Sequence, residues 1–367
     1  MDGGSGKGNL RIGIDTGGTF TDIVSIDASS GEMNVTKVSS TPANPAVGLV
    51  QGIHDVLANS GGDPADVGVI CHGTTVATNA LLQGQIEGLG LIVTKGFRHI
   101  LEIARQAVPD GYGNSYFWVK PERLVPLHHV CEVTGRLNFK GVELSPLDEE
   151  SVREAARTMR QQGTRAIGVC LMHSYANPDH ERRVGEIIAD EYPEAVVSLS
   201  CDVLPEYREY ERAVTTLVDA FVKPYMARYL GNVSEELGPT LREPPFLVMQ
   251  SSGGVISAEQ VVEKPITTAL SGPAAGALGA AVVSRVAGFS DVVTLDAGGT
   301  STDICLIEGG DPHITTDASV GPFPVRLPMI DIRTVGTGGG SIAWLTREGN
   351  LNVGPISAGA VPGPMCY

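Results

Sequence analysis

Residues 14–24 read IDTGGTFTDIV, and this short stretch decides the fold. It places an aspartate, two glycines and three threonines directly after a β-branched run. The pattern predicts a strand over 10–15, a glycine turn over 16–19 and a second strand over 20–27. The SSGE turn at 29–32 then leads into a third strand over 33–40. We therefore expect three antiparallel strands with a glycine turn between the first two.

The same unit occurs again, because RIGIDTGGTFTDIVSID aligns with VVTLDAGGTSTDICLIE. The spacing is constant at 296 − 15 = 281 residues. It superposes Asp15 on Asp296, Gly17 and Gly18 on Gly298 and Gly299, Thr19 on Thr300, Thr21 on Thr302, and Asp22 on Asp303. A repeated strand, turn and strand indicates an internal duplication.

The residue types of the repeat suit a phosphate site. Glycine lets the turn come close to a phosphate and direct N–H groups at it, and threonine adds hydroxyl donors. An aspartate at the end of the first strand can hold Mg²⁺ through water or orient a nucleophile. We expect Asp15 and Asp296 to be the catalytic and metal-binding residues. The expected phosphate-binding residues are Thr16, Gly17, Gly18, Thr19, Ala297, Gly298, Gly299 and Thr300. A purely architectural hairpin pair is the alternative.

Elsewhere, buried strands alternate with helical patterns over short connections, which predicts an α/β architecture with a largely parallel sheet. Residues 1–10 are polar and glycine-rich and predict a loose tail rather than a signal peptide. A first domain is expected to end around Leu199–Leu204. A long helical stretch follows, predicted to be interrupted at Pro224 and to lead into a second domain. The last residues contain no finishing helix, so we expect the second domain to be incomplete.

Composition excludes several function classes. The formal net charge is −16, and the sequence contains no run of basic residues. Both features argue against electrostatic binding to nucleic acid or anionic lipid. No apolar stretch approaches the length of a membrane span. Six cysteines occur without a C-x-x-C pair and suggest reduced thiols in a cytoplasmic protein. No G-x-S-x-G elbow is present, and eight dispersed histidines do not supply the histidine cluster of a metal-dependent hydrolase.

A histidine outside the repeat is also a candidate. His72, in CHGTTVATNA, comes directly after a predicted buried strand, where loops often hold ligands. It is a candidate substrate contact together with Thr74 of the same motif, although a loop histidine satisfied by hydrogen bonds is the alternative.

The sequence resembles the actin-like ATPases, and more closely the hydantoinase A and 5-oxoprolinase family. That family includes N-methylhydantoinases and the ATP-hydrolysing subunits of acetone and acetophenone carboxylases. The motifs that carry the resemblance are RIGIDTGGTFTDIV, HGTTVATNALL, GFRHILEIARQ, LPEYREYERAVTT, MQSSGG, LSGPAAGALGA, TLDAGGTSTDI, RLPMIDIRTVGTGGGSIAW and SAGAVPGPMCY. The resemblance implies two related actin-like, ribonuclease H-like domains around an ATP cleft, over 11–204 and 205–367. It also implies that the GGG run Gly338, Gly339 and Gly340 contacts the nucleotide.

The resemblance further implies a reaction and a partner. Family members are similar in using Mg-ATP to phosphorylate an amide or carbonyl oxygen, so hydrolysis of a cyclic amide such as a hydantoin or 5-oxoproline is expected. A hydantoinase B type subunit is the expected partner in a hetero-oligomer. The alternatives are the ATP-hydrolysing subunit of a ketone carboxylase and a non-catalytic nucleotide switch. Two departures from the family pattern, Arg333 and Val361, bear on the substrate if those positions contact it.

Overall fold

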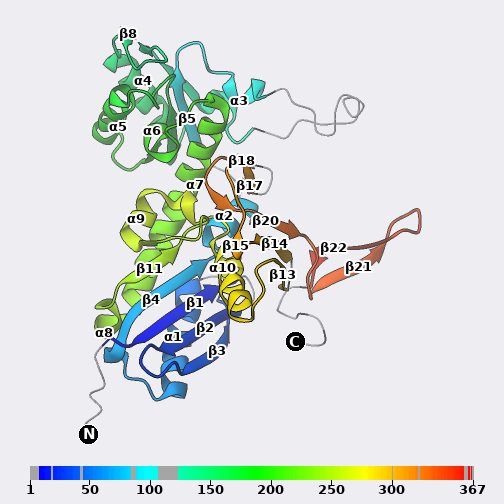
Figure 1. The fold of residues 1–367 in the computed structure, drawn as a ribbon. Helices are drawn as coiled ribbons and strands as arrows, with labels where there is room; N and C mark the ends of the chain where they lie inside the picture. Colours follow the sequence, from blue (N-terminus) through cyan, green and yellow to red (C-terminus); the bar gives the residue numbers. More distant parts are fainter. Residues whose placement is uncertain are drawn as a thin grey trace.

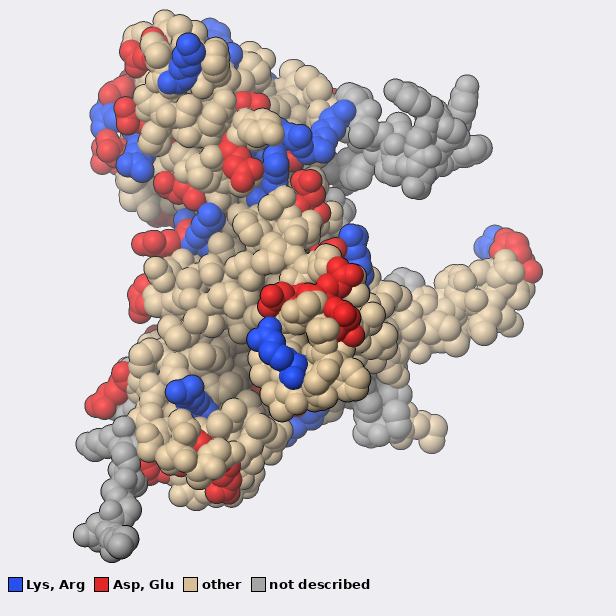
Figure 2. Space-filling view, viewed as in Figure 1, with Lys and Arg blue, Asp and Glu red and all other residues tan. Residues whose placement is uncertain are grey.

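The protein is described here from a computed structural model (Figure 1). The structure describes residues 8–17, 20–41, 44–83, 88–105, 123–299, 301–320 and 323–358, with 363 and 365. Two sheets lie toward opposite ends of the molecule, and a long helix joins them (Figure 1). In Figure 2, acidic and basic side chains are mixed over the end that carries α4 and α5, and this face has no wide basic patch.

The first sheet has six strands in the order β12-β11-β4-β1-β2-β3. Their bounds are β1 (Leu10–Thr16), β2 (Phe20–Asp27), β3 (Met33–Ser39), β4 (Val67–Thr74), β11 (Phe246–Met249) and β12 (Val255–Ser257). β4 runs parallel to β1 and β11, whereas the other three pairs are antiparallel. The predicted hairpin is confirmed. The prediction of a largely parallel sheet is wrong for this first sheet, because tight turns join β1 to β2 and β2 to β3.

One face of this sheet is covered by helices. Ile12, Ile14 and Ile23 are buried there, in a core that includes residues of α1 (Pro45–Ser60) and α7 (Glu209–Glu236). α1 begins where the Asn44 side chain accepts a hydrogen bond from the Ala46 amide and ends at left-handed Gly61. α2 (Val76–Gln83), α8 (Gly238–Arg242) and α9 (Ala258–Glu263) complete this part.

The second sheet is parallel, in the order β10-β9-β5-β6. Its strands are β5 (Leu89–Thr94), β6 (Val130–Val133), β9 (Ala166–Cys170) and β10 (Val196–Leu199). Around it lie α3 (Ile100–Ile103), α4 (Glu149–Gln161), α5 (Asp179–Glu191), α6 (Ser200–Val203) and the hairpin of β7 (Arg136–Leu137) with β8 (Glu143–Ser145). In the described part of the GFRHILEIARQ motif, the helix consists only of the four residues of α3.

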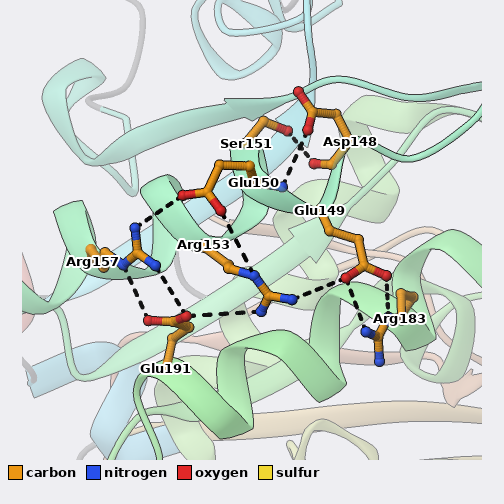
Figure 3. A network of polar contacts seen from close by, with 8 residues as sticks. All are labelled: Asp148, Glu149, Glu150, Ser151, Arg153, Arg157, Arg183 and Glu191. Carbon is orange, nitrogen blue, oxygen red and sulfur yellow. Dashed lines mark hydrogen bonds and ion pairs between the residues drawn. The ribbon is translucent and has the colours of Figure 1, made fainter.

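Ion pairs join the outer sides of α4 and α5 (Figure 3). Arg157 Nε lies 3.2 Å from a carboxylate oxygen of Glu191, and Arg183 Nε lies 2.8 Å from one of Glu149. These side chains are partly or largely exposed, so each pair adds little to stability. The network is a solvated surface between two helices.

The helix α7 joins the two sheets and continues through Pro224 without a break. The predicted interruption is therefore wrong. Proline removes one backbone hydrogen bond, but α7 packs against elements of both sheets, and this packing stabilises the helix. Buried polar contacts also fix it: Arg212 donates to the Leu171 carbonyl over 2.7 Å, and Asp219 accepts from Ser198 Oγ over 2.7 Å.

The second copy of the repeat forms a smaller sheet. Its strands are β13 (Val292–Ala297), β14 (Thr302–Glu308), β15 (Asp311–Pro312) and β20 (Ile332–Val335). α10 (Ser271–Val286) packs between β4 and β11 on one side and β13, β14 and β15 on the other. Three short pairs follow: β16 (Ile314–Thr315) with β19 (Met329–Ile330), β17 (Ala318–Val320) with β18 (Phe323–Val325), and β21 (Ser341–Leu345) with β22 (Leu351–Ser357).

The sheets do not divide at residue 204. β11 and β12 come from beyond Leu204 and extend the first sheet, because β11 pairs in parallel with β4. The division into 11–204 and 205–367 stays a prediction. In the part of the chain that the structure describes, no helix is long and apolar enough to cross a membrane.

Candidate functional site

The two copies of the repeat have the same backbone geometry. Asp15 pairs with Asp22 across the first hairpin, and Asp296 pairs with Asp303 across the second. The turn hydrogen bond also recurs: the Gly17 amide donates to the Phe20 carbonyl over 3.0 Å, and the Gly298 amide donates to the Ser301 carbonyl over 2.9 Å. These positions are 281 residues apart, so the duplication seen in the sequence is confirmed in the fold. Gly18, Thr19 and Thr300 lie outside the described residues.

A third strand supports each hairpin through the equivalent threonine. Thr21 Oγ1 shares a 3.1 Å hydrogen bond with Ser40 Oγ, which donates to the Gly17 carbonyl. In the second copy, Thr302 Oγ1 donates to the Thr337 carbonyl over 2.6 Å. Both turns are therefore tied to the segment that follows the third strand, β3 or β20.

α10 passes both aspartates of the repeat. A Cβ atom built on Gly272 would lie 2.9 Å from Asp15 Oδ1, and one built on Gly276 would lie 3.9 Å from Asp296 Oδ2. Residues four apart lie on one face of a helix. Both carboxylates therefore face the same side of α10, where the two glycines leave room for them.

The carboxyl groups repel one another at this place. Burial, and to a smaller extent the charges of Asp22 and Asp296, together raise the pKa of Asp15 to about 6. Burial also raises the pKa of Asp303, with a smaller contribution from Asp296, although a hydrogen bond from Thr334 Oγ1 acts in the opposite direction. The N-terminus of α10 beside Asp15 carries partial positive charge and offsets part of this repulsion.

Such an arrangement fits a hard cation. Magnesium binds oxygen ligands, keeps several waters and usually takes only one or two carboxylates. Asp15 and Asp296 offer two carboxylates whose charges interact with each other. Within the described ranges, no group of three or more His, Cys, Asp or Glu side chains is placed to enclose a metal.

The glycine loop predicted to contact nucleotide lies against the second turn. The Gly339 amide donates to the Gly298 carbonyl over 2.9 Å, and the Gly340 amide donates to the Gly299 carbonyl over 2.7 Å. The Gly338 amide donates to Ser341 Oγ. The structure thus brings the loop and turn together, while these three N–H groups are already occupied. A nucleotide contact at this loop stays a prediction.

The candidate substrate contacts His72, Thr74 and Arg333 lie away from the aspartates. His72 and Thr74 pair with Ile14 and Thr16 in the sheet, so they lie on the face opposite Asp15. His72 is only 1% exposed, its Nε2 lies 2.8 Å from the Tyr229 hydroxyl, and its Nδ1 has no hydrogen-bond partner. A substrate contact at His72 stays a prediction.

Arg333 is also separated from the aspartates. It pairs with Ile304, which is next to Asp303 in β14. Its side chain therefore lies on the face of the second hairpin opposite Asp303. There it is exposed and lies 3.3 Å from Asp331. Val361 falls outside the described residues.

Sequence reasoning did not single out the residues of α10 and α7 that lie against the two hairpins and β4. Gly272 and Gly276 are a glycine pair at helical spacing, which the motif LSGPAAGALGA contains. Ser271 joins α10 to β4, since its hydroxyl donates to the Thr74 carbonyl over 3.0 Å and accepts from the Thr74 amide over 3.2 Å. Tyr229 offered no signal, because one aromatic residue in a long helix is ordinarily core.

Comparisons with known proteins find relatives that match nearly the whole chain. Caprolactamase subunit alpha of Pseudomonas jessenii is 36% identical over 98% of the chain and 52% of its own length. 5-oxoprolinase 1 of Arabidopsis thaliana is 34% identical over 98% of the chain and 30% of its own length. The chain thus spans about half or less of these relatives.

A solved structure has the same fold. The nucleotide-free structure of acetone carboxylase, from a study of ATP-dependent acetone carboxylation, matches with a TM-score of 0.87 and 31% identity. The match covers 96% of the chain and 51% of that structure's chain. The protein therefore has the mixed α/β fold of about half of the matched acetone carboxylase chain.

Two family models cover nearly the whole sequence. The model described as the hydantoinase/oxoprolinase N-terminal region matches residues 11–192. The model described as hydantoinase/oxoprolinase matches residues 212–367. The chain belongs to the hydantoinase/oxoprolinase family.

Proposed function

We propose that the chain is the ATP-binding part of an enzyme that hydrolyses a cyclic amide. The observation that carries the proposal is the pair of equivalent hairpins whose Asp15 and Asp296 face one side of α10. The family's named members include ATP-dependent enzymes, among them lactam hydrolases and ketone carboxylases. Since the chain spans about half of caprolactamase subunit alpha, the activity of the whole protein is part of the proposal.

The proposed reaction begins with transfer of the γ-phosphoryl group of ATP to the amide oxygen. The bond between the β,γ-bridging oxygen and γ-phosphorus breaks as the new oxygen–phosphorus bond forms, and ADP leaves. Water then adds to the activated carbon, and the ring C–N bond breaks as the nitrogen takes up a proton, which leaves an acyl phosphate. A second water hydrolyses the acyl phosphate to the free carboxylate and phosphate. The overall products are the ring-opened amino acid, ADP and phosphate.

The chain's own residues hold the reacting groups in place. The backbone of Thr16–Thr19 and Ala297–Thr300, together with the side chains of Thr19 and Thr300, binds the phosphates on the side of α10 that Asp15 and Asp296 face. The Thr16 side chain itself is buried on the opposite face of the sheet. Asp15 and Asp296 hold Mg²⁺, which when bound neutralises charge on the phosphate oxygens. Catalysis comes from positioning and charge neutralisation rather than from a covalent step on the protein.

A ketone carboxylase role is the second candidate, and the match to acetone carboxylase favours it. In that case the phosphorylated group is a ketone enol, which passes to a carboxylating partner. A B-type subunit is the proposed partner in either case, in a hetero-oligomer, as the subunit name of caprolactamase subunit alpha suggests.

Phosphate release tests the proposal. The chain is co-purified with a B-type subunit and assayed with Mg-ATP and lactams, hydantoins or ketones, with and without bicarbonate. Stimulation by a cyclic amide without bicarbonate supports the hydrolase, and stimulation only by ketone with bicarbonate supports the carboxylase. If the chain binds ATP but no substrate stimulates its hydrolysis, the result would instead support a nucleotide switch.

Variants of the aspartates test the site. D15N and D296N are each expected to lower ATP turnover at least about 100-fold, because each removes a charge that positions the phosphate. D311N is the matched control, since Asp311 is exposed on β15 and lies outside the site. Unchanged turnover in D15N or D296N would contradict the assignment.

A further inference from the structure

A row of side chains crosses the first sheet on the face that carries Asp15. Asp15 pairs with Gly73 of β4 on one side and with Asp22 of β2 on the other. Asp22 in turn pairs with Lys37 of β3. Residues that pair across neighbouring strands lie on the same face of a sheet. Lys37 therefore lies on the face of Asp15, the face that Gly272 of α10 approaches.

The ammonium group of Lys37 lies beside this row. Its Nζ is 3.1 Å from Asp22 Oδ1 and 5.3 Å from the centroid of the Phe20 ring. Phe20 is the first residue of β2 and follows the glycine turn directly. The ammonium group is therefore held next to a carboxylate of the site and next to the residue that ends the proposed phosphate turn.

This ion pair leaves the ammonium group able to bind an anion. An ammonium group has three N–H donors. Among the described residues, Asp22 is the one carboxylate paired with it. The side chains of Lys37 and Asp22 are 56% and 47% exposed, so an incoming anion can reach the remaining donors. An exposed ion pair adds little to stability, so the hairpin does not depend on it.

Lys37 also offsets the negative charge of the site. The repeat supplies four aspartates, which are Asp15, Asp22, Asp296 and Asp303. In the part of the chain that the structure describes, Lys37 is the only lysine or arginine that forms an ion pair with any of them. A phosphate bound here is attracted by a cation and by N–H donors. Lys37 is the cation that the chain itself supplies.

The second copy of the repeat has a neutral residue at the equivalent place. Thr334 of β20 pairs with Asp303, as Lys37 pairs with Asp22. The Thr334 hydroxyl donates to Asp303 Oδ1 over 2.6 Å. The second hairpin thus holds its carboxylate with a hydroxyl, whereas the first holds it with an ammonium group that has further donors. The positive charge is specific to the first copy.

We propose that Lys37 is a phosphate-binding residue, whose ammonium group contacts a phosphate oxygen of the bound nucleotide while Asp22 holds it in place. The inference rests on the proposed function, since that function brings the nucleotide phosphates to the turn beside Lys37. The ammonium group adds a full positive charge to the partial charges of the backbone N–H groups in the turn. Lysine binds phosphate as a point charge, so the charge matters more than the exact shape of the side chain.

K37M tests this by removing the charge while keeping a long side chain. Mg-ATP binding to the complete chain is measured by isothermal titration at several salt concentrations, and melting is measured without nucleotide. We expect K37M to weaken binding about tenfold, the effect of one charged hydrogen bond. The affinity should also fall less steeply with salt than in wild type. The melting temperature should stay within about 1 °C of wild type.

Two further variants separate this contact from a general effect of charge. K37R keeps the positive charge and should bind Mg-ATP within about threefold of wild type. K140M removes the same charge outside the site. Lys140 is likewise exposed and lies over a phenylalanine ring, 5.6 Å from the centroid of Phe139, in the β7–β8 hairpin. K140M should change neither the affinity nor its salt dependence.

The outcomes distinguish this inference from the proposed function. Wild-type affinity in K37M overturns the inference, and so does an equal loss of affinity in K37R or K140M. Each of these results leaves the proposed function intact, because wild type still binds Mg-ATP. Failure of the wild-type chain to bind Mg-ATP contradicts the proposed function and the inference with it.

Discussion

The carboxyl of Asp15 lies where the folded chain disfavours its charge. Burial raises its pKa from the usual 3.8 to about 6, and the nearby Asp22 and Asp296 act in the same direction. A bound cation would reverse this effect, because an opposite charge favours the ionised form. The residue best suited to hold a cation is therefore one that destabilises the protein without it.

The sign of this effect gives a prediction for D15N. A carboxyl whose pKa is higher in the folded state favours folding when protonated, so the folded state loses stability as the pH rises from about 3.8 to about 6. Asparagine cannot ionise and avoids that loss. We expect the melting temperature of D15N, relative to wild type, to increase by roughly 1–2 °C between about pH 4.5 and pH 7.5. The increase is small because Asp15 remains partly open to solvent.

Calorimetric melting without nucleotide or divalent cation measures this difference. D311N, which changes an exposed carboxyl in the same way, should show no such pH dependence. The pKa assignment for Asp15 is wrong if D15N and wild type keep the same difference in melting temperature across the pH range.

α10 is the element that brings the two halves of the site together, and its glycines give a graded series. In G272A the new methyl group would lie 2.9 Å from Asp15 Oδ1, so the carboxylate must move. We expect Mg-ATP affinity to fall about tenfold while the fold remains intact. In G276A the methyl group would lie 3.9 Å from Asp296 Oδ2, an ordinary contact, and the loss should be below about threefold.

G279A is the control on the same helix. Nothing lies within 4 Å of a Cβ atom at Gly279. Binding should be unchanged, and alanine should stabilise the helix by about 0.5–1 kcal/mol. Isothermal titration with Mg-ATP and thermal melting measure the two effects. Equal binding by all three variants would show that α10 does not position the aspartates.

Elements with local patterns were predictable from the sequence. The β1–β2 hairpin, α1 with its Asn44 cap and Gly61 end, and the equivalent β13–β14 hairpin all follow from residues close together in the chain. Their turns and caps are local chemistry. The candidate aspartates could be predicted for the same reason, because each ends a strand before a glycine turn.

Long-range pairing was not predictable in this way. Nothing local in FLVM shows that β11 joins β4, although Phe246 pairs with Ile70, 246 − 70 = 176 residues earlier. The continuity of α7 through Pro224 depends on packing against two sheets, which local propensity does not contain. The contact between Tyr229 of α7 and His72 of β4 likewise joins residues that are 157 positions apart.

Across the whole molecule, the two copies of the repeat differ in how their outer faces are covered. Ile12 is 1% exposed and Ile14 is 4% exposed, in the core that contains residues of α1 and α7. The equivalent Val293 is 63% exposed and Leu295 is 70% exposed. Leu306 and Val335 extend this open face of the second hairpin, on the side opposite α10. A separate hairpin, β21–β22, projects from the body and carries charged side chains mainly near its tip (Figure 2).

Equivalent substitutions on the two faces should therefore differ in their effect on the stability of the fold. I14T places a hydroxyl in a buried core and removes apolar volume, so we expect a loss of about 2–4 kcal/mol in the free energy of unfolding. L295T changes an exposed side chain and should leave the melting temperature within about 1 °C of wild type. It should also lower the fluorescence of a bound hydrophobic dye by roughly a quarter, since Leu295 is one of four large apolar side chains on the open face. V47T, which changes an exposed valine on α1, is the control and should leave dye binding unchanged. If L295T destabilised the chain as strongly as I14T, the second face would be covered in solution, and the two copies would be alike in packing as well as in backbone.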